Sequence, residues 1–329
     1  MSMQQDMAPD GESFLISFII TYYNIPPDML RRCVRSILAL NLQPCEREII
    51  LVDDGSPISP MDIVEEYRSD IRYIHQPNQG PAVARNAGLD AAKGTYIQYV
   101  DADDYLLKKG FEYCLQWVRQ HPELDIVTLD YTQDRARNCN FTHTPAMSGE
   151  EYMLHYNLYG ADWAYLFRRS TMSGLRFSPG IIHEDEEFIP QMMLRAQWVM
   201  GTTACAYFYQ RREGSIINNE EEAHQQKRLH DFETVIDNLH AMAQGLLQKS
   251  RQALMRRVNQ LTMDHLYNVI QLTRNWNTLE TTVKRLSEKG LFPLPDKRYT
   301  LKYMLFCRLS ATRTGRRILF FIISQHRRP

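Results

Sequence analysis

Gly94-Thr-Tyr-Ile-Gln-Tyr-Val-Asp-Ala-Asp-Asp104 is an apolar run that ends in a cluster of acids. The run is typical of a buried strand, and carboxylates at the carboxyl end of such a strand lie where ligands bind in open α/β sheets. Because strand side chains alternate, Asp101 and Asp103 are expected on the same side. Two such oxygen ligands suit Mg²⁺ or Mn²⁺, which fill their other positions with phosphate oxygens and water. A helix-capping polar turn is the alternative for Asp101 to Asp104 taken alone.

Two earlier strands are predicted to end at the same edge. Arg47-Glu-Ile-Ile-Leu-Val52 leads into Asp53-Asp54-Gly55-Ser56, and Phe14-Leu-Ile-Ser-Phe-Ile-Ile20 leads into Thr21-Tyr-Tyr-Asn24. The turn after the first strand contains no glycine, so the cradle of a dinucleotide-binding dehydrogenase is missing. A diphosphate bound at this edge would need another charge partner, and a divalent cation at Asp103 would supply it.

The rest of the chain first alternates strands with helices and then becomes helical. Such alternation predicts an α/β fold with a largely parallel sheet and right-handed crossovers. We expect strands near 14–20, 47–52, 71–75, 95–100, 125–131 and 163–167, helices near 27–40, 60–69, 81–92 and 106–120, a loop or lid over 133–150, and helical structure over about 221–290.

Six motifs in order resemble the signatures of family 2 glycosyltransferases of the GT-A fold, and the resemblance covers roughly residues 14–217. The motifs are Ser17-Phe-Ile-Ile-Thr-Tyr-Tyr-Asn24, Glu48-Ile-Ile-Leu-Val-Asp-Asp-Gly-Ser56, Asn78-Gln-Gly-Pro-Ala-Val-Ala-Arg-Asn-Ala-Gly88, Tyr99-Val-Asp-Ala-Asp-Asp104, Glu184-Asp185 and Tyr207-Phe-Tyr-Gln-Arg-Arg-Glu-Gly-Ser-Ile216. The resemblance implies a GT-A-like, Rossmann-type mixed sheet flanked by helices, with a helical C-terminal extension. It implies a UDP-sugar donor, a divalent Mn²⁺ or Mg²⁺ ion, and transfer with inversion to a glycan or lipid-linked acceptor.

The resemblance also assigns roles to particular residues. It places the nucleotide base and ribose near Thr21, Tyr23, Asp54 and Arg85, the ribose side and the metal near Asp101, the metal at Asp103, and the diphosphate under a loop with Arg211, Arg212 and Ser215. In the family the Asp of Glu-Asp is the catalytic base, which corresponds to Asp185.

Four consecutive acids, Glu184 to Glu187, precede a helical pattern. Acids in the first turn of a helix are stabilised by its dipole by ~0.3–1 kcal/mol each, so some of the four need no function. Four acids exceed what capping requires, and their mutual repulsion favours a special role for at least one of them.

The composition is that of an ordinary globular protein. Of the 329 residues, 44% are hydrophobic and 23% are charged, which are ordinary values for a globular protein. A chain of this length can bury a sizeable core. The six cysteines form no Cys-x-x-Cys pair and no group with histidines, so we expect buried free thiols rather than disulfides or a zinc site. The polar, acidic start of the chain is not typical of a signal peptide, which predicts a cytoplasmic protein.

The last part of the chain is strongly basic. Nine Lys or Arg and no acid follow from Lys297 onward, leaving 29 basic against 39 acidic residues before it. Apolar residues are interleaved with these charges, a pattern typical of a membrane-surface segment. A C-terminal helix packed on the acidic body is the alternative. Nucleic acid is not expected as a partner, because the rest of the chain would repel phosphates.

We therefore predict four regions and one function. The regions are a disordered tail over 1–13, a glycosyltransferase domain over 14–217, a helical region over 218–296 and a basic amphipathic tail over 297–329. The predicted function is metal-dependent sugar transfer in polysaccharide assembly of the bacterial cell envelope, such as capsule or lipopolysaccharide, with the inner face of the cytoplasmic membrane as an alternative location. The alternatives in function are a non-catalytic binding or scaffold protein on the same fold, and a sugar-nucleotide pyrophosphorylase, which should carry a Gly-rich turn with Arg and Lys after the first strand.

Overall fold

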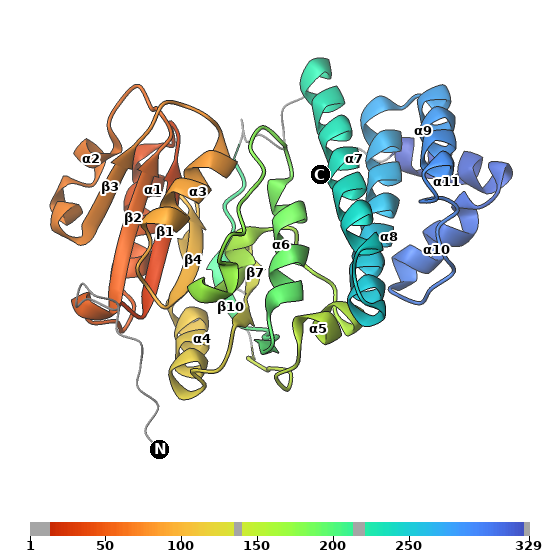
Figure 1. The fold of residues 1–329 in the computed structure, drawn as a ribbon. Coiled ribbons are helices and arrows are strands. Elements are labelled where there is room, and N and C mark those ends of the chain that lie inside the picture. The colour runs from red at the N-terminus through yellow and green to blue at the C-terminus, as the bar shows by residue number, and fades with distance from the viewer. Residues whose placement is uncertain (1–13, 135–139, 213–220, 326–329) are drawn as a thin grey trace. The chain divides into compact units, whose positions relative to one another are not determined.

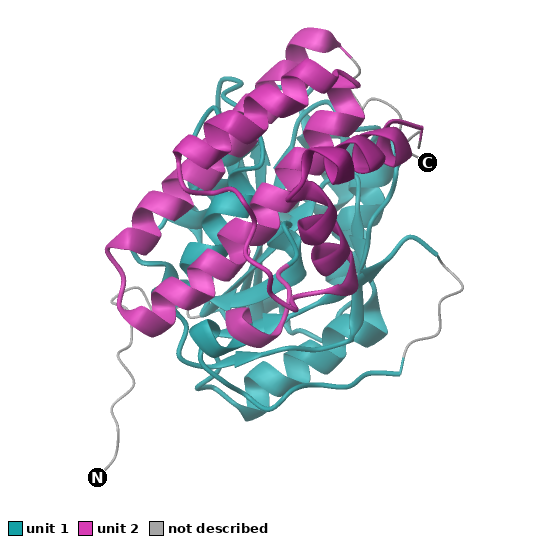
Figure 2. Ribbon diagram, turned by 90° about the vertical axis from the view of Figure 1, so that its right-hand side faces the viewer, with its two compact units in different colours: residues 1–152, 159–213 teal, residues 153–158, 214–329 magenta. Residues whose placement is uncertain are grey.

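A computed structural model describes residues 14–134, 140–212 and 221–325, and the predicted tail over 1–13 lies outside them. The chain divides into two compact units, which Figure 2 distinguishes by colour. The first comprises residues 1–152 and 159–213, and the second comprises residues 153–158 and 214–329. The predicted boundary at residue 296 within the second unit stays a prediction.

A seven-stranded sheet forms the centre of the first unit, in the order β3-β2-β1-β4-β8-β6-β9. Its strands are β1 (Ile16–Tyr22), β2 (Arg47–Asp53), β3 (Ile71–His75), β4 (Tyr96–Asp101), β6 (Ile126–Thr128), β8 (Tyr165–Arg168) and β9 (Val199–Met200). The first four in spatial order are parallel, as predicted, whereas β8 runs antiparallel to both β4 and β6. Strands β1 and β2 are almost wholly buried, as expected for strands covered on both faces.

Helices flank this sheet in the first unit (Figure 1). They are α1 (Pro27–Leu38), α2 (Pro60–Ile63), α3 (Pro81–Ala91), α4 (Lys108–Gln120), α5 (Gly149–His155), whose end belongs to the second unit, and α6 (Glu184–Arg195). Short 3-10 helices are η1 (Pro44–Glu46), η2 (Glu65–Asp70), η3 (Asp162–Ala164) and η4 (Arg169–Met172). The mixed sheet with flanking helices confirms the predicted fold class.

Helix α3 lies unusually close to the sheet, which brings its side chains to the ends of the parallel strands. At Gly88 an added Cβ would come within 2.3 Å of Ile19 Cγ2 on β1. Glycine is therefore required at this position by close approach rather than by backbone conformation. The alanine-rich composition of α3 serves the same packing, because small side chains let a helix lie near a strand.

Two local predictions were wrong. The helix expected over 60–69 is only the four-residue α2 followed by η2, because Val64 leaves helical geometry with φ −115°. The strand expected over 125–131 divides into β6 and β7 (Asp130–Thr132). Strand β7 belongs to a second sheet, in the order β5-β10-β7, with β5 (Tyr105–Leu106) and β10 (Cys205–Phe208). The helix expected near 106–120 is α4, which begins at Lys108 because Tyr105 and Leu106 form β5.

Two of the cysteines that the structure describes depart from the expectation of buried free thiols, and Cys139 lies outside the described residues. Cys205 is disulfide-bonded, and Cys45 is free but exposed. Cys33, Cys114 and Cys307 are buried free thiols, as predicted. Burial raises the pKa of Cys114 to about 12, so its thiol stays protonated and unreactive at neutral pH.

The second unit is helical, as predicted for its first part. Its helices are α7 (Glu222–Gln244), α8 (Gln248–Thr273), α9 (Trp276–Glu288), α10 (Leu301–Ser310) and α11 (Arg313–Gln325). Helix α8 packs against each of the other four, and its buried residues therefore lie on several of its faces. Among the residues that the structure describes, no helix combines the length and apolar character needed to cross a membrane.

Candidate active site

The loop after β2 is held by a buried carboxylate. Asp54 is 4% exposed and accepts hydrogen bonds from the backbone N–H groups of Gln79 (3.0 Å) and Gly80 (2.8 Å), just before α3. Gly55 has φ +79°, and a Cβ there would come within 2.6 Å of the Asn78 nitrogen. Asp54, which is predicted to contact the nucleotide, therefore lies in a loop that its own carboxylate helps to hold.

Strand β1 and the residue after it provide two more of the residues predicted to hold the base and ribose, Thr21 and Tyr23. Thr21 is paired in register with Asp101 of β4, so the ends of these two strands lie side by side. Tyr23 follows β1 and is 51% exposed, whereas Tyr22 before it is buried. An exposed aromatic ring beside strand-end polar groups is available to a planar ligand such as a nucleobase.

The acids after β4 have different environments. Asp104 is 1% exposed, and its carboxylate accepts hydrogen bonds from Tyr207 Oη (2.9 Å) and Gln210 N (2.6 Å). Asp104 therefore joins the end of β4 to the segment after β10. Asp103 points elsewhere, and its Oδ2 lies 2.5 Å from Arg212 Nε. Sequence reasoning assigned Arg212 to the diphosphate and did not single out Asp104 or Tyr207.

Negative charge is in surplus at this strand end. Burial raises the pKa of Asp101 to about 7, with Arg85 opposing the shift and Asp162 and Asp103 adding to it. Burial likewise raises the pKa of Asp104 to about 8, and the charges of Asp101 and Asp103 contribute. Closely spaced carboxylates in a buried place resist ionisation together, and a nearby cation would relieve that repulsion.

Arg85 of α3 connects the acids of three elements. It is 9% exposed, and its guanidinium forms ion pairs with Asp162 of η3, Glu184 of α6 (2.5 Å) and Asp101 of β4 (3.5 Å). All of these ion pairs depend on one buried arginine, and removing it would leave the charges of three carboxylates uncompensated. Its predicted contact with the nucleotide stays a prediction. Asp162 was missed, since nothing in its local sequence marks it.

The predicted catalytic base, Asp185, lies at the start of α6. The residue before this helix, His183, has φ 75° and ψ 34°, a left-handed conformation that is uncommon for a non-glycine residue and is found at functional sites. Glu184 is buried on Arg85, whereas the half-buried Asp185 accepts a hydrogen bond from Glu186 N (2.8 Å). Burial raises the pKa of Asp185 well above its ordinary range, and the charges of Glu184, Glu186 and Asp162 add to the effect.

The predicted diphosphate loop follows β10. Arg211 is exposed, and Arg212 lies on Asp103. Ser215 lies outside the described residues. Arginine suits phosphate because its planar guanidinium can donate two parallel hydrogen bonds.

The acids fit a divalent cation held mainly by its substrate. Among residues 14–134, 140–212 and 221–325, no group of three or more His, Cys, Asp or Glu is assembled as a metal site. Asp101 and Asp103 nevertheless supply oxygen donors in a region of surplus negative charge. Mg²⁺ and Mn²⁺ bind in this way, through one or two carboxylates together with phosphate oxygens.

The mixed sheet and its flanking helices have the GT-A fold of solved glycosyltransferases. A structure of TarS residues 1–349 from S. aureus, in complex with UDP-GlcNAc, has this fold, with a TM-score of 0.62 at 17% identity over 94% of this chain and 90% of that chain. The profile of glycosyl transferase family 2 matches residues 17–179.

Two curated relatives support the same assignment. The chain is 30% identical to the glycosyltransferase GlyG of Streptococcus pneumoniae over 63% of its own length and 74% of the relative. It is 31% identical to the uncharacterized glycosyltransferase EpsJ of Bacillus subtilis over 61% of its length, and the match spans only 62% of that relative. The chain belongs to glycosyl transferase family 2, which confirms the resemblance.

Proposed function

We propose that this protein is an inverting, metal-dependent glycosyltransferase that uses a UDP-sugar. The observation that carries the proposal is the Arg85 network, which unites Asp101 at the end of β4 with Glu184, the neighbour of Asp185, at the start of α6. A donor-side acid and an acceptor-side base thereby belong to one site. The UDP-GlcNAc complex of the similarly folded TarS supports the choice of UDP.

The donor would lie across the ends of the parallel strands. We assign the base and ribose to Thr21, Tyr23, Asp54 and, through its network, Arg85, with Asp101 on the ribose side. Asp101 and Asp103 would hold the cation, and Arg211, Arg212 and Ser215 would lie over the diphosphate. The cation's contribution is to stabilise the negative charge that develops on the leaving diphosphate.

Asp185 would act on the acceptor as a general base. Its raised pKa means that it binds a proton more readily than an ordinary carboxylate, as proton transfer from a hydroxyl requires. The acceptor oxygen then forms a bond to the anomeric carbon as the bond to the diphosphate oxygen breaks, and Asp185 takes the hydroxyl proton. One displacement from the opposite side inverts the anomeric configuration.

Nucleotide binding gives the direct test. UDP with Mn²⁺ should raise the melting temperature of the full chain, because a ligand at 100 times its dissociation constant adds about 2.7 kcal/mol of stability. UDP with EDTA should raise it much less. Hydrolysis of a panel of nucleotide sugars would then identify the donor, and NMR of the transfer product would give its anomeric configuration.

The same assays distinguish the alternatives. A scaffold protein would bind UDP without hydrolysing any donor, and a pyrophosphorylase would form UTP from UDP-sugar and pyrophosphate. If UDP with Mn²⁺ did not raise the melting temperature, the proposed donor would be contradicted. If UDP raised it equally in EDTA, the proposed metal would be contradicted.

We further propose that the acceptor is lipid-linked and that α10 and α11 contact the membrane surface. Large apolar side chains are exposed on both helices, including Leu301 (74%), Leu305 (62%) and Phe321 (67%). Basic residues such as Arg313 and Arg317 are exposed beside them. Exposed apolar side chains with neighbouring cations fit an anionic lipid surface, where each Lys or Arg contributes ~1 kcal/mol.

The buried sides of the same helices belong to the core of the second unit. Tyr303 and Phe306 are buried, and Arg316 Nε lies 2.6 Å from Glu280 Oε1 on α9. The sequence left two interpretations open for residues 297–329, a membrane-surface segment and a helix packed on the body of the protein. The exposed side of α10 and α11 fits the first, and their buried side fits the second. Removing residues 297–329 would expose the core, so point substitutions on the exposed side are the cleaner test.

Replacing Leu305 and Phe321 together by glutamate should abolish co-sedimentation with vesicles that contain phosphatidylglycerol, while the melting temperature stays near that of the wild type. Wild-type binding should weaken with salt and on pure phosphatidylcholine. Leu247→Glu is the matched control, because Leu247 is 84% exposed outside this surface. Failure of the wild type to bind anionic vesicles at low salt would end the membrane proposal.

A further inference from the structure

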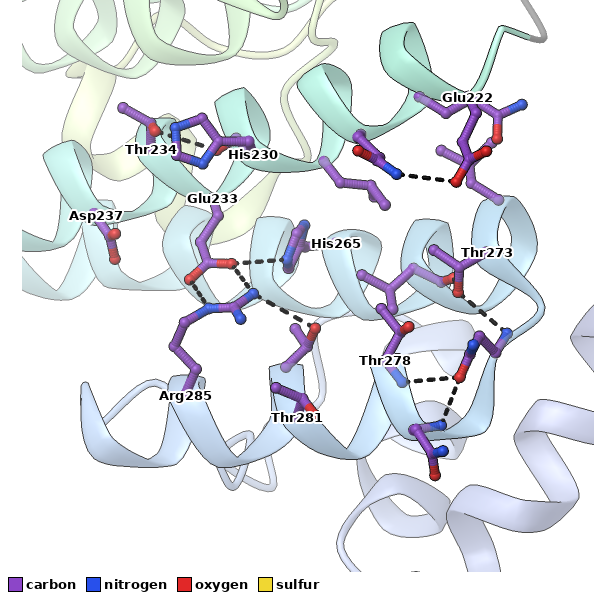
Figure 3. Close-up of a pocket in the computed structure, with 18 of the residues that line it drawn as sticks. Glu222, His230, Glu233, Thr234, Asp237, His265, Thr273, Thr278, Thr281 and Arg285 are labelled. Atoms are coloured by element: carbon purple, nitrogen blue, oxygen red, sulfur yellow. Dashed lines mark hydrogen bonds and ion pairs between the residues drawn. The ribbon is translucent and has the colours of Figure 1, made fainter.

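A large cavity lies within the second unit, between α7, α8 and α9 (Figure 3). Its volume is about 950 Å³, at the upper end of the range typical of ligand-binding pockets. It extends along α7 from Glu222 to Asp237, which corresponds to a length of ~22 Å at 1.5 Å per residue. None of its lining residues belongs to the site described above, so the proposed sugar transfer leaves the cavity without a role.

A buried histidine with an unused ring nitrogen lines the cavity. His265 of α8 is 1% exposed, its Nε2 lies 3.4 Å from Glu233 Oε2, and Phe232 stacks on its ring with centroids 6.0 Å apart. Within the part of the chain that the structure describes, neither ring nitrogen of His265 has a hydrogen-bond partner, and only Nε2 has a charged neighbour, Glu233. An unpaired polar atom this deeply buried costs free energy, and a bound ligand that supplied its partner would remove that cost.

Four charged side chains of the cavity, Glu233, Asp237, Arg285 and Lys289, are paired with one another. Arg285 donates to both carboxylate oxygens of Glu233 (2.7 and 2.6 Å), as the labelled pair in Figure 3 shows. Lys289 bridges Glu233 (2.8 Å) and Asp237 (2.5 Å). Because both cations, Arg285 and Lys289, are already paired with carboxylates, they are not available to bind phosphates.

The remaining lining is mostly uncharged and polar. Thr278, Thr281 and Thr282 lie on one face of α9, because residues three and four apart are neighbours on a helix. Apolar side chains from α7 and α8, Leu229 and Val269 among them, line the cavity together with these hydroxyls. Hydroxyl groups beside small apolar patches match a sugar ring, which has hydroxyls at its edge and C–H groups on its faces.

We propose that this cavity binds a segment of uncharged glycan, separately from the nucleotide-sugar donor. Sugar hydroxyls both donate and accept hydrogen bonds, so one of them can donate to His265 Nδ1 when Nε2 carries the proton beside Glu233. The length of the cavity accommodates several linked sugar rings. The choice of a glycan over another neutral polar ligand rests on the proposed transfer to a glycan acceptor, whose growing chain the second unit would hold.

Calorimetric titration of the full chain tests the proposal. The probes are neutral tetrasaccharides of glucose, galactose, mannose and N-acetylglucosamine, each titrated with UDP and Mn²⁺ present to occupy the donor site. At least one should bind. Thr281→Trp, which fills the cavity from an exposed lining position, and His265→Phe, which keeps the ring but removes its nitrogens, should each weaken that binding about tenfold or more.

Lys284→Trp is the matched control. It introduces the same bulky residue on the same helix at a side chain that is 81% exposed and does not line the cavity, and it should bind the glycan as the wild type does. All three variants should hydrolyse the donor at the wild-type rate, so the proposal can fail while the proposed function stands. Binding of none of the four probes by the wild type, or unchanged binding by Thr281→Trp, would overturn the proposal.

Discussion

Replacing Asp185 by asparagine is expected to lower the rate of sugar transfer about 10²–10⁴-fold, the usual contribution of a general base. Asparagine has the shape of aspartate but cannot accept the proton of the acceptor hydroxyl. Asp185 lies at the start of α6 with a raised pKa, and it is not one of the acids proposed to hold the donor's cation. The affinity for UDP with Mn²⁺ should therefore change little, as isothermal titration would show.

The stability of this variant should move in the opposite direction to its activity. A carboxyl whose pKa is raised in the folded state favours the fold when protonated and opposes it when ionised, so its contribution is lost as pH rises. At neutral pH the uncharged asparagine side chain would relieve that repulsion, and the melting temperature of Asp185→Asn should equal or exceed that of the wild type. A loss of activity with unchanged or higher stability identifies a catalytic rather than a structural role.

The neighbouring acid provides the control. Glu186→Gln removes one of the charges that raise the pKa of Asp185, so the acid limb of the rate profile should move to lower pH while the maximal rate stays near the wild-type value. The limb should be absent in Asp185→Asn. If donor affinity and turnover fell together in Asp185→Asn, the residue would instead belong to the donor site or to the structural framework.

Replacing Asp103 by asparagine should weaken Mn²⁺-dependent binding of UDP by at least about 100-fold, because it removes one of two carboxylates proposed to hold the cation. The residual binding should no longer differ between Mn²⁺ and EDTA. Its ion pair with Arg212 is partly exposed to solvent, so its loss should affect the fold little. Titration of UDP with and without metal, beside thermal unfolding, measures both effects.

Asp90→Asn is the matched control, because Asp90 also pairs with an arginine, Arg176, in the same unit but outside the site. It should bind UDP and Mn²⁺ as the wild type does. Wild-type metal dependence in Asp103→Asn would refute the metal assignment and leave Asp103 as the partner of Arg212 alone.

The strands that carry the site could be predicted because their signal is local. Continuous apolar runs that end in acids or polar residues marked β1, β2 and β4 to within two residues at either end. The antiparallel part of the sheet was harder, since β8 and β6 are three or four residues long and their direction depends on pairing with distant strands. The second sheet was missed for the same reason, because β5 has only two residues and pairs with β10 about 100 positions later.

The sequence by itself determined the family, the GT-A fold and the set of acids that belong to its motifs, because each motif is a short run of neighbouring residues. Only the tertiary structure decided how those acids are held. Arg85 pairs with Glu184, 99 positions later, and Asp104 bonds to Tyr207, 103 positions later, and neither is visible in any local pattern. The cavity with His265 likewise exists only where α7, α8 and α9 pack together. Charge pairing and burial depend on which side chains meet in space, and periodicity along the chain reports only on which residues share a face.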